Sequence, residues 1–381
     1  MKESGKRRSW GELATNKSKK YNPKNENNFI KCIELEHLGS GTGQLLGFVD
    51  GSKSESIKNI FLKDDVLFGK LRPYLRKYHQ PTFDGVCSSE IWVLNGKKIS
   101  NAFLYYLIQT NMFIDLANQS SGSKMPRADW NIIENGVFSF PPISEQQKVH
   151  SFLSLIDERI NTQKKIIEGL ETSMESLTEK IFSQKLRFKD ENRNEFSNWE
   201  TKKLGDVLVK YEKKTIFNNQ YPVLTSARTG IHFQKDYFDG NEVASKNNTG
   251  YNIVPKGYFT YRHMSDDIVF KFNINTICEN GIVSTLYPVF TTIGLNDYFL
   301  KTYLNTGQEF KNYALMQKQG GSRTYMYFTK LTQLVLPFPY IKEQNKIANF
   351  LSFIDTKIDI EKQILEKMEE QKKYLLQNLF I

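Results

Sequence analysis

A heptad pattern of apolar residues occurs twice in the chain. In the first copy, from about residue 144 to 188, apolar positions recur at alternating intervals of four and three residues. This spacing is typical of the seam along which two helices of a coiled coil pair. The second copy, from about 342 to the last residue, repeats the first at an offset of 198 residues, the difference between Glu145 and Glu343. The predicted seam positions are Leu153, Ile156, Ile160, Gln163 and Ile167 in the first copy and Leu351, Ile354, Ile358, Glu361 and Leu365 in the second.

Each seam carries a polar residue near its middle. Gln163 and Glu361 occupy the same position in the two copies, and one buried polar site can fix the register and orientation of a helix pair. An antiparallel pairing with the midpoints together would bring the two polar sites close, and a parallel pairing would align them too. The alternatives are a coiled coil between two chains or ordinary core helices. We favour pairing within the chain, because a duplicated seam supplies its own partner at high effective concentration.

The segments outside the helices also repeat in order. Short β-like runs punctuated by Gly, Asn and Pro precede each heptad stretch, and the sequence at 85–88 resembles that at 281–284. Away from such anchors the two segments differ. We expect an α+β fold: two similar mixed α/β globules separated by two long helices that form an antiparallel coiled coil, with a pseudo-twofold internal repeat. The expected parts are the first globule at 1–143, the first helix at 144–188, a linker and the second globule at 189–341, and the second helix at 342–381.

Composition narrows the choice of partner. The chain has 381 residues, of which 39% are hydrophobic, and its formal net charge is +10. The length is enough for two or three domains, and the hydrophobic fraction indicates a globular chain. The positive charge favours an anionic partner, of which nucleic acid is the usual one.

The cysteines and the apolar runs indicate the compartment. Cys32, Cys87 and Cys278 are odd in number and widely separated, so they form neither a disulfide framework nor a metal-ligand motif. The N-terminus lacks the apolar segment of a signal peptide. The longest apolar run, around 103–108, is too short to span a bilayer. We therefore expect a cytoplasmic protein without a membrane partner.

A search for catalytic motifs gives none that favours an enzyme. The strings at 140–143 and 337–340 lack the Asn or Asp that an amino-group methyltransferase would need. The stretch Gly39-Ser40-Gly41-Thr42-Gly43 lacks the lysine of a phosphate-binding loop, so we interpret it as a mobile loop. The five histidines show no metal-ligand spacing. We expect no catalytic residue, metal or cofactor in this chain.

Basic and polar residues gather at matching places in the two globules. Phosphate contacts need Lys and Arg, and base contacts need polar side chains on reachable loops. A solvated charged face is the alternative for each cluster. The candidate DNA contacts in the first globule are Lys70, Arg72, Arg76, Lys77, Ser121, Ser123, Lys124 and Arg127. Those in the second globule are Arg262, His263, Gln317, Lys318, Gln319, Ser322, Arg323 and Tyr325.

Four strings lie at the borders of the predicted globules and helices. They are Phe140-Pro141-Pro142-Ile143-Ser144-Glu145-Gln146 and Pro337-Phe338-Pro339-Tyr340-Ile341-Lys342-Glu343-Gln344, each leading into a helix, and Phe196-Ser197-Asn198-Trp199 with Lys203-Leu204-Gly205-Asp206-Val207. In these strings and in its architecture the chain resembles the specificity subunits of type I restriction–modification systems. One departure is that the first globule opens with only Arg8-Ser9-Trp10-Gly11-Glu12-Leu13.

The resemblance implies a recognition role. Each globule would read one half of an asymmetric, bipartite target in double-stranded DNA. The helix pair would hold two methyltransferase subunits, which carry S-adenosylmethionine, and a motor-nuclease subunit is a further partner. The alternatives are a stand-alone sequence-specific DNA-binding regulator and a coiled-coil scaffold without a DNA role. An affinity for DNA that falls steeply with added salt would argue against the scaffold.

Overall fold

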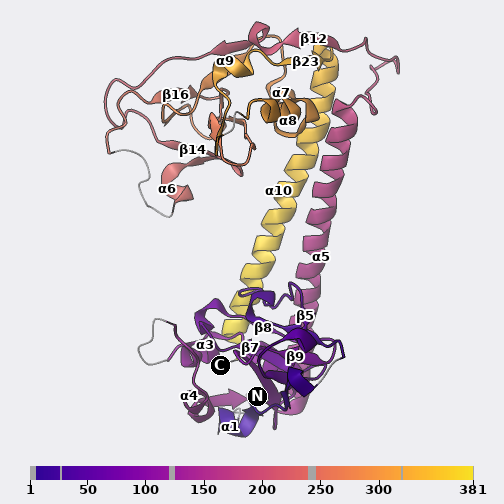
Figure 1. Cartoon of the computed structure of the whole chain (residues 1–381), viewed down its shortest axis with the longest axis vertical. Coiled ribbons are helices and arrows are strands. Elements are labelled where there is room, and N and C mark those ends of the chain that lie inside the picture. The colour runs from indigo at the N-terminus through magenta and orange to yellow at the C-terminus, as the bar shows by residue number, and fades with distance from the viewer. Residues whose placement is uncertain (1–5, 26–27, 120–124, 239–245, 319–320, 381) are drawn as a thin grey trace. The chain divides into compact units, whose positions relative to one another are not determined.

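The computed structural model describes residues 6–25, 28–119, 125–238, 246–318 and 321–380. The chain divides into two compact units (Figure 1). The first unit contains residues 1–165 and 363–381, and the second contains residues 166–362. Each unit therefore holds one globule together with a part of both long helices, α5 (Ile143–Phe182) and α10 (Ile341–Asn378).

The two long helices begin in the same way. Both follow a strand and a proline-containing segment, where a proline fits because it has no backbone N–H to donate. The carbonyl of Pro142 accepts from the amides of Glu145 and Gln146, and the carbonyl of Tyr340 accepts from those of Glu343 and Gln344. The helices then continue for 40 and 38 residues.

In each unit, α5 and α10 pack side by side and run antiparallel. The seam positions face this contact, and charged residues beside the seam form ion pairs between the helices. The residue numbers in these ion pairs increase along α5 and decrease along α10, as an antiparallel pairing requires. At the far end of the series Arg187, just after α5, binds Glu343 at the start of α10. The other ion pairs are Asp157–Lys372 (2.6 Å) and Lys164–Glu369 (2.8 Å) in the first unit and Glu171–Lys362 (2.7 Å) in the second.

The first globule packs its helices against a four-stranded sheet, with a five-stranded sheet beside it. The elements are β1 (Lys6–Ser9), α1 (Trp10–Leu13), β2 (Ala14–Thr15), β3 (Lys20–Tyr21), β4 (Lys31–Ile33), β5 (Val49–Asp50), β6 (Lys58–Phe61), β7 (Val66–Gly69), β8 (Tyr78–His79), β9 (Gly85–Cys87), β10 (Ile91–Gly96), α2 (Asn101–Leu107), α3 (Asn111–Ala117), α4 (Trp130–Asn135) and β11 (Val137–Phe140). The strand orders of the two sheets are β2-β10-β7-β8 and β3-β6-β9-β4-β5, and β1 pairs with β11.

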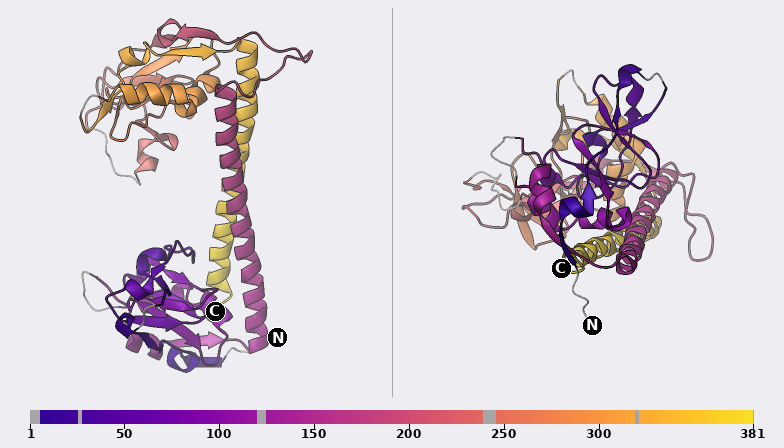
Figure 2. Two further views of the ribbon diagram at one scale, coloured as in Figure 1. Left: turned by 45° about the vertical axis from the view of Figure 1, so that its right-hand side comes forward. Right: turned by 90° about the horizontal axis from the view of Figure 1, so that it is seen from below.

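The core of the first globule continues into the long helices. The ring of Trp10 packs against Phe113 in a tilted arrangement and against Phe138 edge to face, with centroid distances of 4.7 and 5.0 Å. Leu153 of α5 is fully buried in the same cluster. Phe380, which follows α10, packs on Phe103 at 5.1 Å, beside the C-terminal end visible in Figure 2. The globule and its helix segments thus share one hydrophobic core.

The second globule has the same kind of core on a four-stranded sheet of order β13-β21-β17-β19, with three two-stranded pairings around it and β12 paired with β23. Its core includes Ile181 of α5 and Leu351 of α10. The elements are β12 (Glu200–Lys203), β13 (Leu208–Lys210), β14 (Leu224–Ala227), β15 (Gly230–Phe233), α6 (Gln234–Tyr237), β16 (Asn252–Pro255), β17 (Phe259–Thr260), β18 (Met264–Ser265), β19 (Asn273–Ile274), β20 (Asn280–Val283), β21 (Val289–Thr292), α7 (Asp297–Thr306), α8 (Gln308–Met316), β22 (Thr324–Tyr325), α9 (Phe328–Leu331) and β23 (Val335–Phe338).

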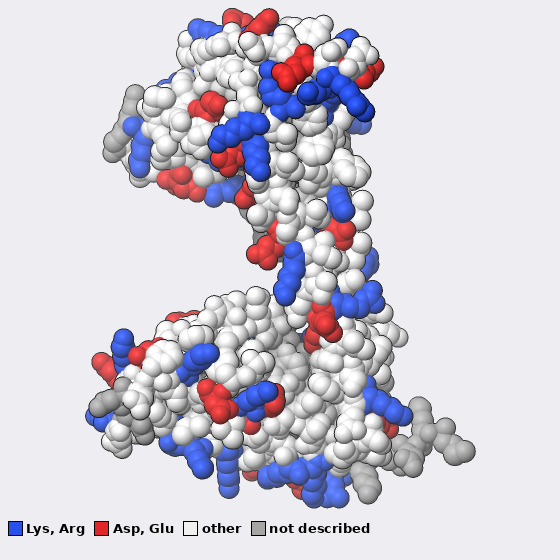
Figure 3. Space-filling view, turned by 90° about the vertical axis from the view of Figure 1, so that its right-hand side faces the viewer, with Lys and Arg blue, Asp and Glu red and all other residues white. Residues whose placement is uncertain are grey.

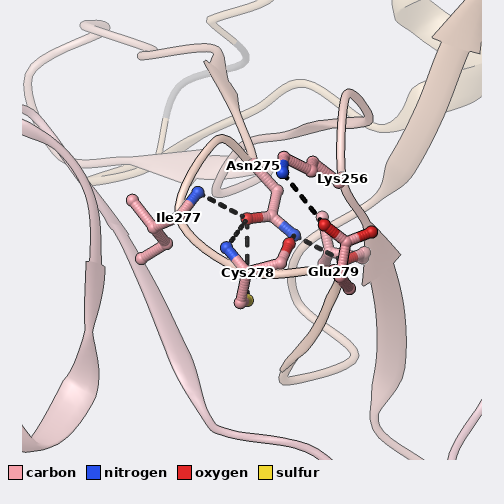
Figure 4. Close-up of polar contacts among 6 residues, drawn as sticks. Lys256, Asn275, Ile277, Cys278 and Glu279 are labelled. Atoms are coloured by element: carbon pink, nitrogen blue, oxygen red, sulfur yellow. Dashed lines mark hydrogen bonds and ion pairs between the residues drawn. The ribbon is translucent and has the colours of Figure 1, made fainter.

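A buried asparagine shapes the turn between β19 and β20. The side-chain oxygen of Asn275 accepts from the amides of Ile277 and Cys278, and its amide nitrogen donates to the carbonyls of Val254 and Cys278 (Figure 4). Lys256, which follows β16, forms an ion pair at 2.9 Å with Glu279 of this turn. Because Asn275 is fully buried, these bonds satisfy polar groups that water cannot reach.

The two globules repeat one plan. In each, the opening strand pairs antiparallel with the strand that leads into a long helix, as β1–β11 and β12–β23 do. The short opening of the first globule therefore still supplies this strand. Each four-stranded sheet is followed by two consecutive helices, α2–α3 or α7–α8. The predicted α+β class, the internal repeat and the antiparallel pairing of two long helices in one chain are confirmed.

Candidate nucleic-acid interface

A short strand pairing joins the two predicted clusters of the first globule. Leu71 and Arg127 form an isolated antiparallel bridge. On either side of it, the amide of Ala128 donates to Lys70 and that of Arg72 donates to Pro126, both at 2.8 Å. Residues about 55 positions apart in sequence therefore lie side by side.

The second globule contains the same pairing. There β18 and β22 are antiparallel neighbours, with Met264 opposite Tyr325 and Ser265 opposite Thr324. The amide of Met326 donates to the carbonyl of His263 at 2.7 Å, as Ala128 donates to Lys70. In both globules the structure thus brings together two clusters that the sequence placed far apart.

Several basic residues of the first globule bind neighbouring parts of that globule. Arg76 donates to the side chain of Asn111 at 2.7 Å, and Lys77 donates to the carbonyl of Leu35 at 2.6 Å. Both are half-buried. Arg127 is exposed and forms an ion pair with Glu90 at 3.1 Å. Arg72 is exposed and Lys70 is half-buried.

The loop from Arg72 to Arg76 has an unusual backbone. Both arginines are left-handed, with φ of 53° and 49°, and they flank a 3₁₀ turn at Pro73–Leu75. Left-handed non-glycine residues cost conformational energy and occur where surrounding contacts hold them. The turn presents Tyr74, which is 53% exposed, between the two arginines. This aromatic residue belongs to the candidate surface.

The glycine-rich stretch packs against this loop. The amide of Gly41 donates to the carbonyl of Arg76 at 3.0 Å, and the hydroxyl of Tyr78 donates to the carbonyl of Gly41 at 3.2 Å. A ring nitrogen of His79 lies 2.9 Å from the carbonyl of Gly43. The interpretation of 39–43 as a mobile loop therefore missed these contacts, which join residues far apart in sequence.

The second globule presents aromatic and charged groups at the equivalent place. Tyr325 and Tyr327 stack with ring centres 5.7 Å apart, and the ring of His263 lies 4.9 Å from Tyr327. His263 is itself buried, and one of its ring nitrogens lies 2.5 Å from the carbonyl of Leu286. Arg323 pairs with Asp266 at 2.8 Å.

Sequence reasoning missed two members of this surface. Tyr327 follows Tyr325 by two positions, the spacing at which residues of an extended segment share a face. Arg228 comes from the distant β14–β15 turn and binds both carboxylate oxygens of Asp267, at 2.6 and 2.7 Å. Hydrogen bonds from Arg228 lower the pKa of Asp267 to about 2. Nothing local in the sequence connects Arg228 to this site.

The remaining candidate residues are placed as follows. Arg262, Lys318 and Ser322 are exposed, and Gln317 is half-buried. Ser121, Ser123, Lys124 and Gln319 lie outside the described residues. In the view of Figure 3, Lys and Arg side chains are interspersed with Asp and Glu. Binding an anion at the second globule would therefore compete with the ion pairs of Arg323 and Arg228.

The predicted seam residues lie on the inner side of the helix pair. Within the two units, all ten are buried or half-buried, whereas many of their neighbours along the helices are exposed. The fully buried ones include Leu153 and Leu351. The polar Gln163 is buried and Glu361 is half-buried.

The described residues show no sign of a metal site or a membrane span. No group of three or more His, Cys, Asp or Glu side chains among them is arranged to hold a metal ion. Likewise, none of the described helices is both long and apolar enough to cross a bilayer.

Known proteins are similar to this chain in sequence and in fold. The sequence matches the family model described as type I restriction modification DNA specificity domain over residues 6–172 and 196–370. The type I restriction enzyme MjaVIII specificity subunit of Methanocaldococcus jannaschii is 25% identical over 327 residues, covering 77% of this chain and 72% of that protein. The putative MjaX specificity subunit of the same organism is 26% identical over 368 residues, covering 87% and 81%.

Two solved structures have a similar fold. A chain from a study of complex assembly and conformational transition of the type I R-M system aligns with a TM-score of 0.60 at 15% identity, covering 98% of this chain and 97% of that one. The S subunit of a type I restriction–modification system from M. genitalium aligns with a TM-score of 0.56 at 14% identity, covering 100% and 97%. At these identities the likeness shows the fold alone.

Proposed function

The chain belongs to the family of type I restriction–modification DNA specificity subunits, which are non-catalytic, and from this premise we propose how its parts divide the work. Each globule reads one half of a bipartite, asymmetric target in double-stranded DNA. The helix pair sets the spacing between the halves and docks two methyltransferase subunits. The functional parts are residues 1–143, 144–188, 189–341 and 342–381.

The partners supply the chemistry in this proposal. The methyltransferase subunits carry S-adenosylmethionine, and this chain binds no cofactor. A motor-nuclease subunit joins the complex as a further partner, and the complex acts in the cytoplasm. The chain itself contributes recognition of the target sequence.

One observation carries the assignment of the two readers. The same two-strand pairing joins two polar clusters in each globule, but it presents different side chains. Arg127 occupies the position that Tyr325 occupies in the second globule, and Lys70 the position of His263. Contacts to base edges specify sequence, whereas contacts to the DNA phosphates only position the protein. Two readers of different half-sites therefore need a shared scaffold that carries different side chains.

Exposed apolar residues on the long helices support the docking role. Three pairs of such residues recur at the same 198-residue offset as the seam. In each helix, two of the three residues are three positions apart and share a face. Contiguous exposed apolar patches indicate an interaction surface. Their occurrence at equivalent positions on both helices fits two copies of one partner. The pairs are Phe152 with Phe350, Leu155 with Phe353, and Ile166 with Ile364.

The test is to co-express the chain with a type I methyltransferase subunit and to map methylated adenines in the host DNA. We expect one split target with a fixed gap, and an affinity of the complex for DNA that falls steeply as salt rises. Arg127→Ala should weaken discrimination in one half of the target and Arg323→Ala in the other. A chain that binds a target as tightly alone as in the complex would favour a stand-alone regulator instead.

A further inference from the structure

A buried glutamine joins each globule to its long helix. The side-chain oxygen of Gln146, at the start of α5, accepts from the backbone amide of Ser100 at 3.1 Å, and its nitrogen donates to the carbonyl of Pro141 at 2.9 Å. Gln344, at the start of α10, makes the same two bonds, to the amide of Asn296 and the carbonyl of Pro339, both at 2.9 Å. Both glutamine side chains are essentially inaccessible to water.

The glutamines bind only backbone atoms of the globule. Ser100 and Asn296 are the N-cap residues of α2 and α7, and their own side chains cap those helices by accepting from Phe103 and Phe299. An N-cap leaves its backbone amide free for an outside acceptor. The joint therefore depends on the position of a helix end and not on the identity of a globule side chain.

A second contact lies further along each long helix. The hydroxyl of Tyr106 in α2 donates to Asp157 of α5 at 2.9 Å, and the hydroxyl of Tyr298 in α7 donates to Asp355 of α10. The two aspartates are equivalent in the repeat, being 198 positions apart, but the two tyrosines lie on different turns of their helices. The contact is thus present in both units although the globule residues that make it have moved.

The two contacts together restrict movement of the globule. Gln146 and Asp157 are eleven positions apart, which is roughly 16 Å at about 1.5 Å per residue along a helix. The same separation applies to Gln344 and Asp355. The shared core already holds the globule against the helix, and two polar contacts at this separation add directional bonds that oppose tilting and sliding of the globule along it.

We propose that Gln146 and Asp157 in the first unit, and Gln344 and Asp355 in the second, are positioning residues that clamp each globule on its own long helix. The clamp fixes the angle at which a globule meets DNA, so the permitted gap between half-sites depends on it as well as on helix length. The inference rests on the proposed reading of two half-sites. It adds that residues remote from the DNA restrict the gap.

The first experiment measures gap discrimination. The complex with methyltransferase subunits is prepared with Gln146→Leu, with Gln344→Leu, and with the matched control Gln147→Leu, whose side chain is exposed. Methylation rates are compared on the mapped target and on targets whose gap is one base pair longer or shorter. For the two clamp variants we expect unchanged half-site sequences and about tenfold weaker discrimination between gaps, the order expected for one or two lost hydrogen bonds. The control should discriminate as the parent does.

A purely structural role would give another result. Loss of stability alone would lower methylation equally on all three gaps, and this outcome would overturn the inference. Tyr106→Phe and Tyr298→Phe provide milder variants, since each removes one hydroxyl and preserves the ring. They should also methylate targets over a broader range of gap lengths than the parent does. Unchanged discrimination between gaps in all four variants would contradict the clamp.

Amide hydrogen exchange separates failure of the clamp from failure of the proposed function. The exchange of residues 100–107 and 143–150 is measured on the chain in its complex without DNA. Faster exchange in Gln146→Leu than in Gln147→Leu supports the clamp, and equal exchange contradicts it. A parent complex that methylates no split target would overturn the proposed function, whatever the exchange shows.

Discussion

In the second unit, Arg187 and Glu343 form an ion pair that joins the segment after α5 to the start of α10. Glu343 is fully buried, and Arg187 binds its two carboxylate oxygens at 3.1 and 2.7 Å. Arg187 also donates to the carbonyl of Ser197 at 2.7 Å. The repeat-equivalent Glu145 is exposed. The same Glu-Gln motif therefore has a structural ion pair in one unit and a solvated carboxylate in the other, a difference that the repeat in the sequence does not indicate.

Replacing Arg187 with Met should destabilise the second unit strongly. The variant leaves the carboxylate of Glu343 buried without its partner, which costs roughly 3–5 kcal/mol. Urea unfolding, followed by tryptophan fluorescence, measures the change. Glu145→Gln is the control, and its effect should stay within about 0.5 kcal/mol. The double variant Arg187→Met/Glu343→Leu should recover much of the loss, and a double variant no more stable than the single one would contradict this role.

The cysteines should differ in reactivity. Burial raises the pKa of the Cys32 thiol to about 12 and also raises the pKa of Cys87, so neither forms the reactive thiolate at neutral pH. Burial also raises the pKa of Cys278, but this side chain is only half-buried and so remains accessible to a reagent. With iodoacetamide at pH 8, mass spectrometry should detect modification of Cys278 first, and of Cys32 and Cys87 only after denaturation. Equal rates for all three thiols in the folded chain would show that the first globule is not packed as described.

At the scale of elements, the heptad pattern predicted the helices well because its period is local and repeats many times. The first helix was expected to continue to about 188, but α5 ends at Phe182, and Gln184 adopts a left-handed conformation with φ of 59°. The pairing of distant clusters at Leu71–Arg127 was not predictable, since it depends on how the chain folds between them. The role of Arg228 was missed for the same reason.

Two leucines of α5 test which face of the helix is buried. Leu153 is fully buried, and Leu155, two positions later, is 59% exposed. Leu153→Ala should lower the free energy of unfolding by roughly 2–5 kcal/mol, because it removes buried apolar groups and leaves a cavity. Leu155→Ala should change it by less than about 0.5 kcal/mol. Chemical denaturation of both variants checks this, and equal losses would place the seam elsewhere.

At the scale of the whole molecule, the two units repeat one scaffold but differ in their exposed surfaces. The seam, the glutamine joints and one ion pair between the helices, Lys164–Glu369 with its repeat equivalent Lys362–Glu171, recur in both units, whereas the exposed groups on the two strand pairings differ. In the proposed function, the repeated surfaces hold two identical partners while the two globules recognise different sequences. The repeated scaffold was predictable because it recurs within one sequence. The DNA bases that each globule would read were not, because base contacts depend on loop geometry.

The exposed apolar residues of the helices should matter for assembly more than for stability. Phe353, which is 71% exposed, and its repeat equivalent Leu155 are the residues to change. Phe353→Ser combined with Leu155→Ser should reduce co-purification of methyltransferase subunits severalfold, with little change in unfolding. Glu158→Ser is a control at an exposed polar position of α5. Full assembly by the double variant would assign docking to another surface.

The most direct test of the central claim is to exchange the first globule. Residues 1–143 are replaced with the corresponding globule of another specificity subunit, the hybrid is expressed with methyltransferase subunits, and the methylated target is sequenced. Two independent readers on one helix pair predict that one half of the target changes while the other half and the gap stay the same. A hybrid that changes both halves, or neither, would contradict the account.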